Sequence, residues 1–162
     1  MELEARATCP LLKEVEPMFH HILICSDGSE HALKAAYMAG ELARTFHARL
    51  TMLTVFNPWT VSYSAATVHP KEPVDLPLMA DYVESIEAEI ERRTLDAVGK
   101  VECRFLREMG HPVDKIAHVA QRDQVDLIVV GSRGLGRFQS QLLGSTSEGV
   151  VRHALCPVLI VR

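Results

Sequence analysis

Short apolar runs recur along this chain, and segments of helical periodicity separate them. Apolar runs within residues 20–26, 126–130 and 157–161 predict strands that are covered on both faces, and residues 49–56, which Asn57-Pro58 stop, predict another strand. In residues 101–107, apolar and charged positions alternate, which is typical of a strand with one wetter side at the edge of a sheet. The pattern therefore predicts five strands.

The segments between these strands carry apolar residues at the spacing of an amphipathic helix. Strands joined by helix-length crossovers pair in parallel, because a tight hairpin cannot connect them. We therefore expect an open α/β sheet with helices on both faces, and ligands in such sheets bind beyond the carboxyl ends of the strands. The helices are expected around Leu33 to Ala43, Met79 to Ile90, Val113 to Ala120 and about residues 145–153.

Two segments fall outside this pattern. Residues 1–18 are expected to be an N-terminal extension, and residues 19–162 a single domain. Residues 58–77 contain four prolines, which predict a long loop or lid. Trp59 in this loop either stacks on a bound base or packs against the surface of the domain.

Composition narrows the class of protein. The 162 residues are 48% hydrophobic, which suffices for a sizeable core, and no apolar run approaches the roughly 20 residues of a membrane-spanning helix. The formal charge of -4 comes from interspersed acids and bases, without the basic stripe that binds nucleic acid. The acidic start does not resemble a secretory signal, and the four cysteines form no C-x-x-C pair. We expect a cytoplasmic protein without a membrane span, a zinc site or a nucleic acid partner.

A stretch rich in glycine and hydroxyl residues, 131–146, follows the apolar run at 126–130 and leads into the last expected helix. Glycine lets backbone N–H groups approach an anion closely, and the N-terminus of a helix favours negative charge. The stretch therefore predicts a phosphate site, with a flexible glycine turn as the alternative. Its candidate residues are Gly131, Ser132, Arg133, Gly134, Gly144, Ser145 and Thr146.

A second polar turn, Asp27-Gly28-Ser29, ends the first apolar run. If the first and fourth strands are neighbours, this turn and the glycine-rich stretch share one crevice. Asp27 or Ser29 is available to cap the helix that follows. A carboxylate beside phosphates is repelled unless a cation intervenes, so Asp27 alternatively indicates Mg2+ or a hydrogen bond to a ribose hydroxyl.

The spacing of the glycines is similar to a known nucleotide-binding signature. The chain resembles the signature of the ATP-binding branch of the universal stress protein family, in which two residues separate Gly131 from Gly134 and nine separate Gly134 from Gly144-Ser145. The resemblance extends over residues 20–162, and it implies a Rossmann-like sheet of five parallel strands in the order 3-2-1-4-5. It further implies that ATP lies over strands one and four and that a homodimer forms through the final strand. The other matching motifs are residues 22–29, 110–112, 126–132 and 156–161.

The same resemblance implies a role for each site residue. Asp27 would lie near the ribose and the phosphates or their metal, and Val55 would offer backbone groups to the adenine. Arg133, like Arg137, would screen phosphate charge unless both are solvated loop residues. The remaining residues would hold the ribose and phosphates of ATP, with or without Mg2+, namely Gly131, Ser132, Gly134, Gly144, Ser145 and Thr146.

The leading hypothesis is an ATP-binding sensor or switch in the stress response, in which nucleotide occupancy alters the dimer or the lid. Catalysis beyond slow ATP hydrolysis is not expected, because the Walker lysine pattern, the kinase loops and a histidine triad for a metal are absent from the sequence. Three alternatives stay open: a dimeric stress protein that binds no nucleotide, an adenylating enzyme of a related fold, and a protein for AMP or a cyclic nucleotide. The intact glycine spacing disfavours the first, and the missing Ser-Gly-Gly-x-Asp-Ser loop disfavours the second.

Overall fold

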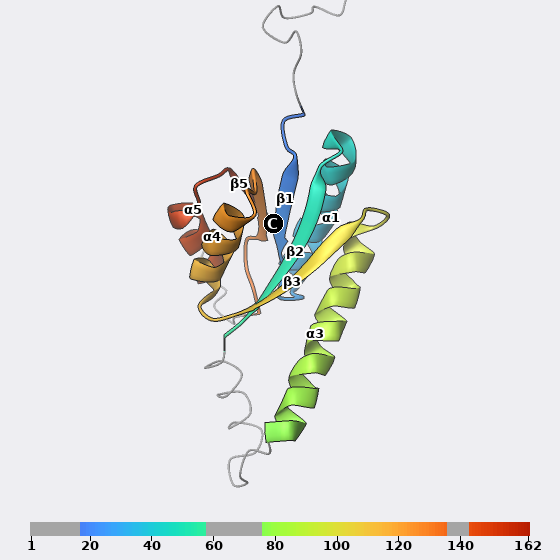
Figure 1. Ribbon diagram of the computed structural model, residues 1–162, viewed down its shortest axis with the longest axis vertical. Coiled ribbons are helices and arrows are strands. Elements are labelled where there is room, and N and C mark those ends of the chain that lie inside the picture. The colour runs from blue at the N-terminus through green and yellow to red at the C-terminus, as the bar shows by residue number, and fades with distance from the viewer. Residues whose placement is uncertain (1–16, 58–75, 136–142) are drawn as a thin grey trace, which may run out of the picture.

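Five parallel strands form the centre of the molecule. The computed structural model describes residues 17–57, 76–135 and 143–162 (Figure 1). Within them the strands follow the order β3-β2-β1-β4-β5, and every pairing is parallel. This confirms the open sheet that the sequence pattern predicts and the strand order that the family resemblance implies. The strands are β1 (His21–Cys25), β2 (Arg49–Phe56), β3 (Cys103–Met109), β4 (Leu127–Gly131) and β5 (Val158–Val161).

Helices cover both faces of the sheet, as predicted (Figure 1). The chain first moves from β1 outward to β3, then returns to β4 and moves on to β5. A right-handed crossover places its helix on one face in the first direction and on the other face in the second, so β1 and β4 meet at the switch point. The first face carries α1 (Glu30–Phe46) and α3 (Leu76–Val98), and the second carries α4 (Pro112–Arg122) and α5 (Ser145–His153).

The start of α3 corrects a predicted boundary. The helix begins at Leu76, inside the segment that the sequence predicts as a loop up to residue 77. Proline is compatible with the first turn of a helix, so the last proline of that segment does not prevent the helix from starting there. The rest of the predicted loop, residues 58–75 with Trp59, lies outside the described residues.

The strand β3 lies at one edge of the sheet, as its alternating pattern predicts. It starts later than the alternation suggests, because the N–H of Val101 donates to the C=O of Gly99 in the turn after α3. It then runs on to Met109, which lies opposite Phe56 of β2. An ion pair between Arg107 of β3 and Glu87 of α3, 2.9 Å apart, holds the long helix against this edge.

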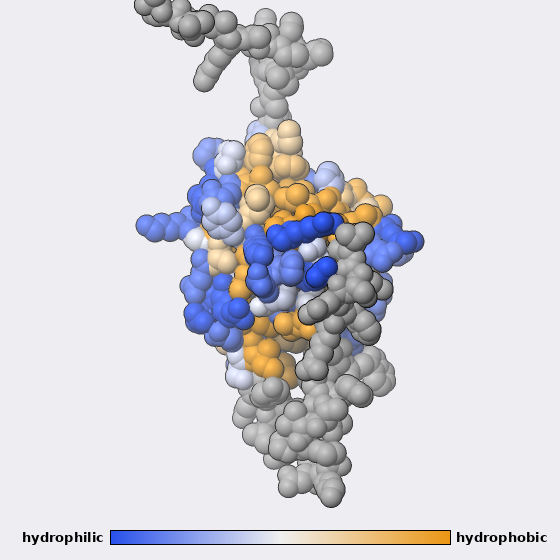
Figure 2. Space-filling model, turned by 180° about the vertical axis from the view of Figure 1, so that it is seen from behind, coloured by the Kyte–Doolittle hydropathy of each residue, from blue (hydrophilic) through white to orange (hydrophobic). Residues whose placement is uncertain are grey.

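The opposite edge strand, β5, leaves apolar surface exposed. It is half-buried along its whole length, whereas its neighbour β4 is buried throughout. Leu155, just before this strand, adds to the exposed apolar surface, since it is 86% exposed. Seen from behind, hydrophobic residues gather in the upper part of the face and in a smaller group below, with hydrophilic residues at the sides and between the two groups (Figure 2). Among the described residues, no helix is long and apolar enough to cross a membrane.

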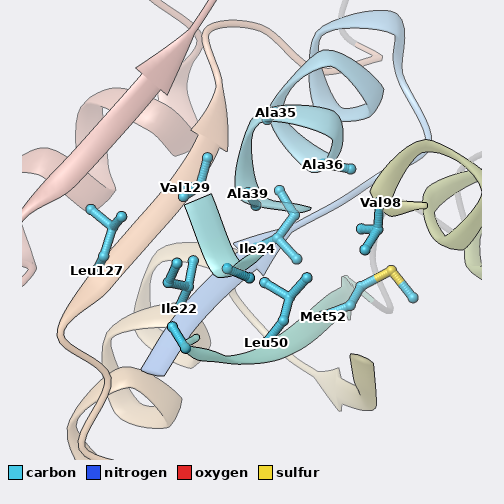
Figure 3. Packing of buried hydrophobic residues seen from close by; sticks show 12 residues of the cluster. Ile22, Ile24, Ala35, Ala36, Ala39, Leu50, Met52, Val98, Leu127 and Val129 are labelled. Atoms are coloured by element: carbon cyan, nitrogen blue, oxygen red, sulfur yellow. The ribbon is translucent and has the colours of Figure 1, made fainter. Parts of the chain in front are cut away.

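Two apolar clusters hold the layers together. Successive strand residues point to opposite faces, so Ile24 of β1 packs against α1 and α3, whereas Leu23 packs against α4 and α5. Figure 3 shows the first cluster, where small side chains such as Ala39 let α1 lie close to the strands. Gly40 serves the same purpose between the helices, since a Cβ at this position would overlap the C=O of Val98 at the end of α3.

Candidate functional site

A cleft of about 560 Å³ opens at the carboxyl ends of β1, β2 and β4, on the face that α4 and α5 cover. This is the switch point of the sheet, where the turn after β1 and the segment after β4 lie side by side. Eight of the nine residues predicted for the site line this cleft, so the tertiary structure brings segments from three strand ends together. They are Asp27, Val55, Gly131, Arg133, Gly134, Gly144, Ser145 and Thr146.

Ser132, the ninth predicted residue, is 2% exposed and does not line the cleft. Its N–H donates to the C=O of Val161 in β5 (2.7 Å), and its C=O accepts from the N–H of Gly144 (2.8 Å). Ser132 also borders a separate cavity of about 150 Å³, with His31, Arg133 and Arg162. Its backbone therefore ties the end of β4 both to the edge strand and to the start of α5.

The strand β2 runs past the end of β1, so among the described residues no strand pairs with the last part of this edge. The N–H of Ser26 donates to the C=O of Leu53 (3.0 Å), and β1 ends at this point. Phe56 turns its C=O to the other side, where it accepts from the N–H of Gly110 (2.9 Å). Backbone groups alternate in direction along a strand, so Val55 lies in phase with Leu53. The N–H and C=O of Val55 therefore face the cleft as an adjacent donor and acceptor.

The glycines after β4 are surrounded by atoms of the protein itself. A Cβ at Gly131 would lie 2.6 Å from the carbonyl carbon of His31 and 2.8 Å from the nitrogen of Ala32, both in the first turn of α1. A Cβ at Gly134 would lie 2.5 Å from Oδ2 of Asp27. The backbone of α1 requires glycine at position 131, whatever ligand the cleft holds, whereas a side chain at position 134 would displace the carboxylate of Asp27.

The carboxylate of Asp27 accepts two backbone hydrogen bonds. Oδ1 accepts from the N–H of Ser29 (3.0 Å), and Oδ2 accepts from the N–H of Leu135 (3.1 Å) in the segment after β4. Of the two candidates for capping α1, Ser29 is the cap, because its Oγ accepts from the N–H of Ala32. The same Oγ donates to the C=O of Arg133 (3.3 Å), which is a second link between the two loops.

The helix α5 begins at the cleft without a side-chain cap. Its N-cap is Gly144, which has no side chain to accept from the first-turn N–H groups. Ser145 is exposed and Thr146 half-buried at this helix start, and both line the cleft. Ser147 instead points inward, and its Oγ donates to the C=O of Gly131 (2.7 Å). The N-terminus of α5 therefore presents amides and hydroxyls with a positive partial charge to the cleft.

Asp27 and Arg133 are the charged residues that line the described part of the cleft. Cys25 also lines it, but burial raises the pKa of its thiol far above the ordinary value, and Cys156 adds to this rise. The thiol stays protonated and is not an activated nucleophile. In the described segments, no group of three His, Cys, Asp or Glu side chains is placed to hold a metal ion.

Several lining residues are missing from the predicted set. Leu53 and Cys25 belong to predicted strands, but the sequence does not show which strand end faces a cleft. Others come from the start of α4, which reaches the site only because this helix covers the same face of the sheet. The turn before α4 could have indicated these residues, because its glycine and proline end β3 near the site. The additional residues are Cys25, Ser26, Ala32, Leu53, Pro112, Ile116, Val130, Leu135, Leu143 and Ser147.

The fold and the cleft define a Rossmann-like α/β protein with a cleft at the switch point of its sheet. The model of the universal stress protein family matches residues 18–162, and the chain belongs to this family. A universal stress protein of Thermus aquaticus, encoded in the QAH/OAS sulfhydrylase 3' region, is 37% identical over 145 residues, which cover 90% of this chain and 100% of the relative.

Solved structures of the family have the same fold. The universal stress protein UspA from Lactobacillus plantarum superimposes with a TM-score of 0.71 at 26% identity, over 92% of this chain and 100% of that protein. A universal stress protein solved in complex with cAMP superimposes with a TM-score of 0.61 at 28% identity, over 89% of this chain and 97% of that protein. The second comparison shows that a member of this fold binds a nucleotide.

Proposed function

We propose that this protein binds an adenine nucleotide, ATP in the first place, in the cleft at the switch point, and that it acts as a nucleotide-dependent sensor or switch in the stress response. One observation carries the proposal: the free backbone edge at Val55 and the uncapped start of α5 at Gly144 face the same cleft of about 560 Å³. The first suits a planar base with a donor and an acceptor, and the second suits phosphates. The relative in complex with cAMP supports the nucleotide class.

Each part of the nucleotide has a matching group in the cleft. The N–H and C=O of Val55 would bind the polar edge of the adenine, and Asp27 would accept from a ribose hydroxyl with a lone pair that its backbone bonds leave available. The amides and hydroxyls of Ser145 and Thr146 would bind phosphates, and Arg133 would screen their charge. Gly144 would let the phosphates approach the helix start. Mg2+, where it is needed, would enter with the phosphates.

The proposed role is regulatory. A hydrolase needs a base that orients water or a placed metal. We assign the carboxylate of Asp27 to two backbone amides and a ribose hydroxyl, and burial raises the pKa of the Cys25 thiol, so neither group is proposed as that base. We therefore propose at most slow ATP hydrolysis, and that occupancy of the cleft is the signal. Prolonged incubation with ATP and Mg2+ tests this, and rapid product formation would contradict it.

The ligand is best identified directly. Mass analysis of small molecules released from the purified protein should detect ATP or ADP, and calorimetric titration should show binding of ATP. The parallel titration with cAMP decides between the two nucleotides, since the solved relative holds cAMP. Binding of neither nucleotide, together with preparations free of any nucleotide, would favour a stress protein that works through partner contacts.

Position 144 offers a matched pair of variants for the phosphate site. A Cβ there has room, with its nearest neighbours at 3.5 Å, and both Asp and Asn are good N-cap residues. Gly144→Asp and Gly144→Asn should therefore fold alike, with equal circular dichroism and melting. The negative charge of Asp should weaken ATP binding by about tenfold or more relative to Asn. Equal ATP affinity of the two variants would exclude phosphates from the start of α5.

We also propose a domain of residues 19–162 after an extension of residues 1–18, in agreement with a family match that begins at residue 18. A cytoplasmic location is proposed because the described cysteines, Cys25, Cys103 and Cys156, are free thiols, as a reducing compartment requires.

A homodimer through β5 is the remaining part of the proposal. The C=O groups of Pro157 and Val161 accept bonds from β4, so the backbone groups of Val158 and Ile160 point away from the sheet. Such a free edge can pair with a second copy, and the apolar residues on this side favour contact. Sedimentation equilibrium should give a dimer, and Ile160→Pro, which removes one outward N–H, should give a folded monomer. A monomeric wild type would reject this interface.

A further inference from the structure

The side chain of Asp27 joins two loops that lie far apart in the sequence. Its bond to the N–H of Leu135 spans 108 residues, and the bond from Ser29 Oγ to the C=O of Arg133 spans 104. Both bonds tie the turn after β1 to the glycine-rich segment after β4. The side chain of Leu135 does not anchor this segment, because the residue is 72% exposed. The hydrogen bonds to the turn after β1 therefore hold residues 133–135, in addition to the backbone bonds that Ser132 makes with Val161 and Gly144.

The same carboxylate explains the glycine at position 134. A Cβ there would lie 2.5 Å from Oδ2 of Asp27, the atom that accepts the bond from Leu135. A side chain at position 134 would push either the carboxylate or the segment away. The hydrogen bond to Leu135 and the close approach to Gly134 involve the same oxygen of Asp27, so the carboxylate lies where only glycine leaves room for it.

We propose that Asp27 is the positioning residue of the nucleotide site: its carboxylate, held by two backbone amides, fixes residues 133–135 before ligand binds, and Gly134 is glycine because of this carboxylate. The inference rests on the proposed nucleotide function only for its effect on affinity. It also explains why an acidic residue lies beside a phosphate site, since its charge is balanced by N–H donors of the protein. A segment fixed beforehand does not have to be ordered when the nucleotide binds.

Hydrogen exchange of the protein without nucleotide tests the positioning directly. Asp27→Ala removes both acceptors, so the amide of Leu135 should exchange about tenfold faster or more, as the loss of one charge-assisted hydrogen bond gives. Asp27→Asn keeps one carbonyl oxygen and should fall in between. The amide of Ala154, which donates to Val150 at the far end of α5, is the internal control and should not change. An unchanged exchange rate at Leu135 would overturn the proposal.

A double-mutant cycle tests the fit between the two residues. Gly134→Ala should accelerate exchange at Leu135 in the wild-type background but add little when Asp27→Ala is already present, because the clash is then gone. Additive effects would show that Gly134 is required for another reason and would contradict the proposal. This arm also needs no nucleotide, so it holds even if the protein binds none.

ATP titrations with Mg2+ and with a chelator separate positioning from metal binding. Loss of a positioning residue should weaken ATP binding by about tenfold in both conditions, because the segment is misplaced whether or not a metal is present. Loss of a metal ligand would weaken binding in Mg2+ alone, and that result would assign Asp27 to the metal instead. If the wild type binds no ATP at all, the proposed function fails, while the exchange measurements still decide the role of Asp27.

Discussion

The two glycine groups of the site, at the end of β4 and at the start of α5, differ in what surrounds them. A Cβ at Gly131 would meet the backbone of α1 at 2.6 Å, and a Cβ at Gly134 would meet Asp27 at 2.5 Å. A Cβ at Gly144 would have ordinary contacts, the nearest at 3.5 Å, and its φ of -71° suits any residue. The first group is therefore required by the protein, whereas the second leaves space for a ligand.

This difference shows that one sequence signature combines two physical requirements. The glycines after β4 bring α1 and the turn after β1 close to the strand end, which shapes the floor of the cleft. The glycine before α5 leaves the helix start without a side-chain cap, which is the arrangement that the proposed phosphate site needs. The bond from Ser147 Oγ to the C=O of Gly131 joins the two groups, so neither can shift alone.

Gly131→Ala should have the largest effect on stability. The added methyl group overlaps backbone atoms of His31 and Ala32, which cannot rotate away as a flexible side chain would. We expect a loss of about 3 kcal/mol in the free energy of unfolding, measured by urea denaturation. If the variant were as stable as the wild type, α1 would be free to move, and the distinction between the glycine groups would fail.

Ser147→Ala should have an intermediate effect, because it removes the bond that joins the two glycine groups. The Oγ is buried, and its loss leaves the C=O of Gly131 without this partner. We expect a loss of about 1.5 kcal/mol in the free energy of unfolding. Ser145→Ala is the control, because Ser145 lies two residues earlier at an exposed position, and it should change stability little. Equal effects of both variants would mean that the inward bond does not stabilise the site.

Gly144→Ala should have the smallest effect, although it is the same substitution as at Gly131. Alanine is a poorer N-cap than glycine, but it also reduces the freedom of the unfolded chain, and these effects oppose each other. We expect a change within about 1 kcal/mol in the same denaturation experiment. A loss as large as that of Gly131→Ala would show that the protein, not a ligand, requires glycine here.

Much of the fold could be predicted from local patterns. Buried parallel strands appear as continuous apolar runs, and β3 alternates because one edge of the sheet is wetter. The start of α3 was harder, since proline punctuates loops but also fits the first turn of a helix. The choice between Asp27 and Ser29 as the cap of α1 depends on side-chain direction, which the residue types do not reveal.

The glycine spacing and the acidic turn were enough to indicate where the cleft lies, because both follow apolar runs that end at the same edge of a parallel sheet. The tertiary structure was needed to separate the roles of the three glycines at the cleft. Gly131 is required by backbone atoms of α1 and Gly134 by the carboxylate of Asp27, and in both cases the contacting residue lies about a hundred positions away in the sequence. Gly144 makes ordinary contacts only. Spacing along a chain carries local conformation, whereas close approach between distant segments is set by how the layers pack.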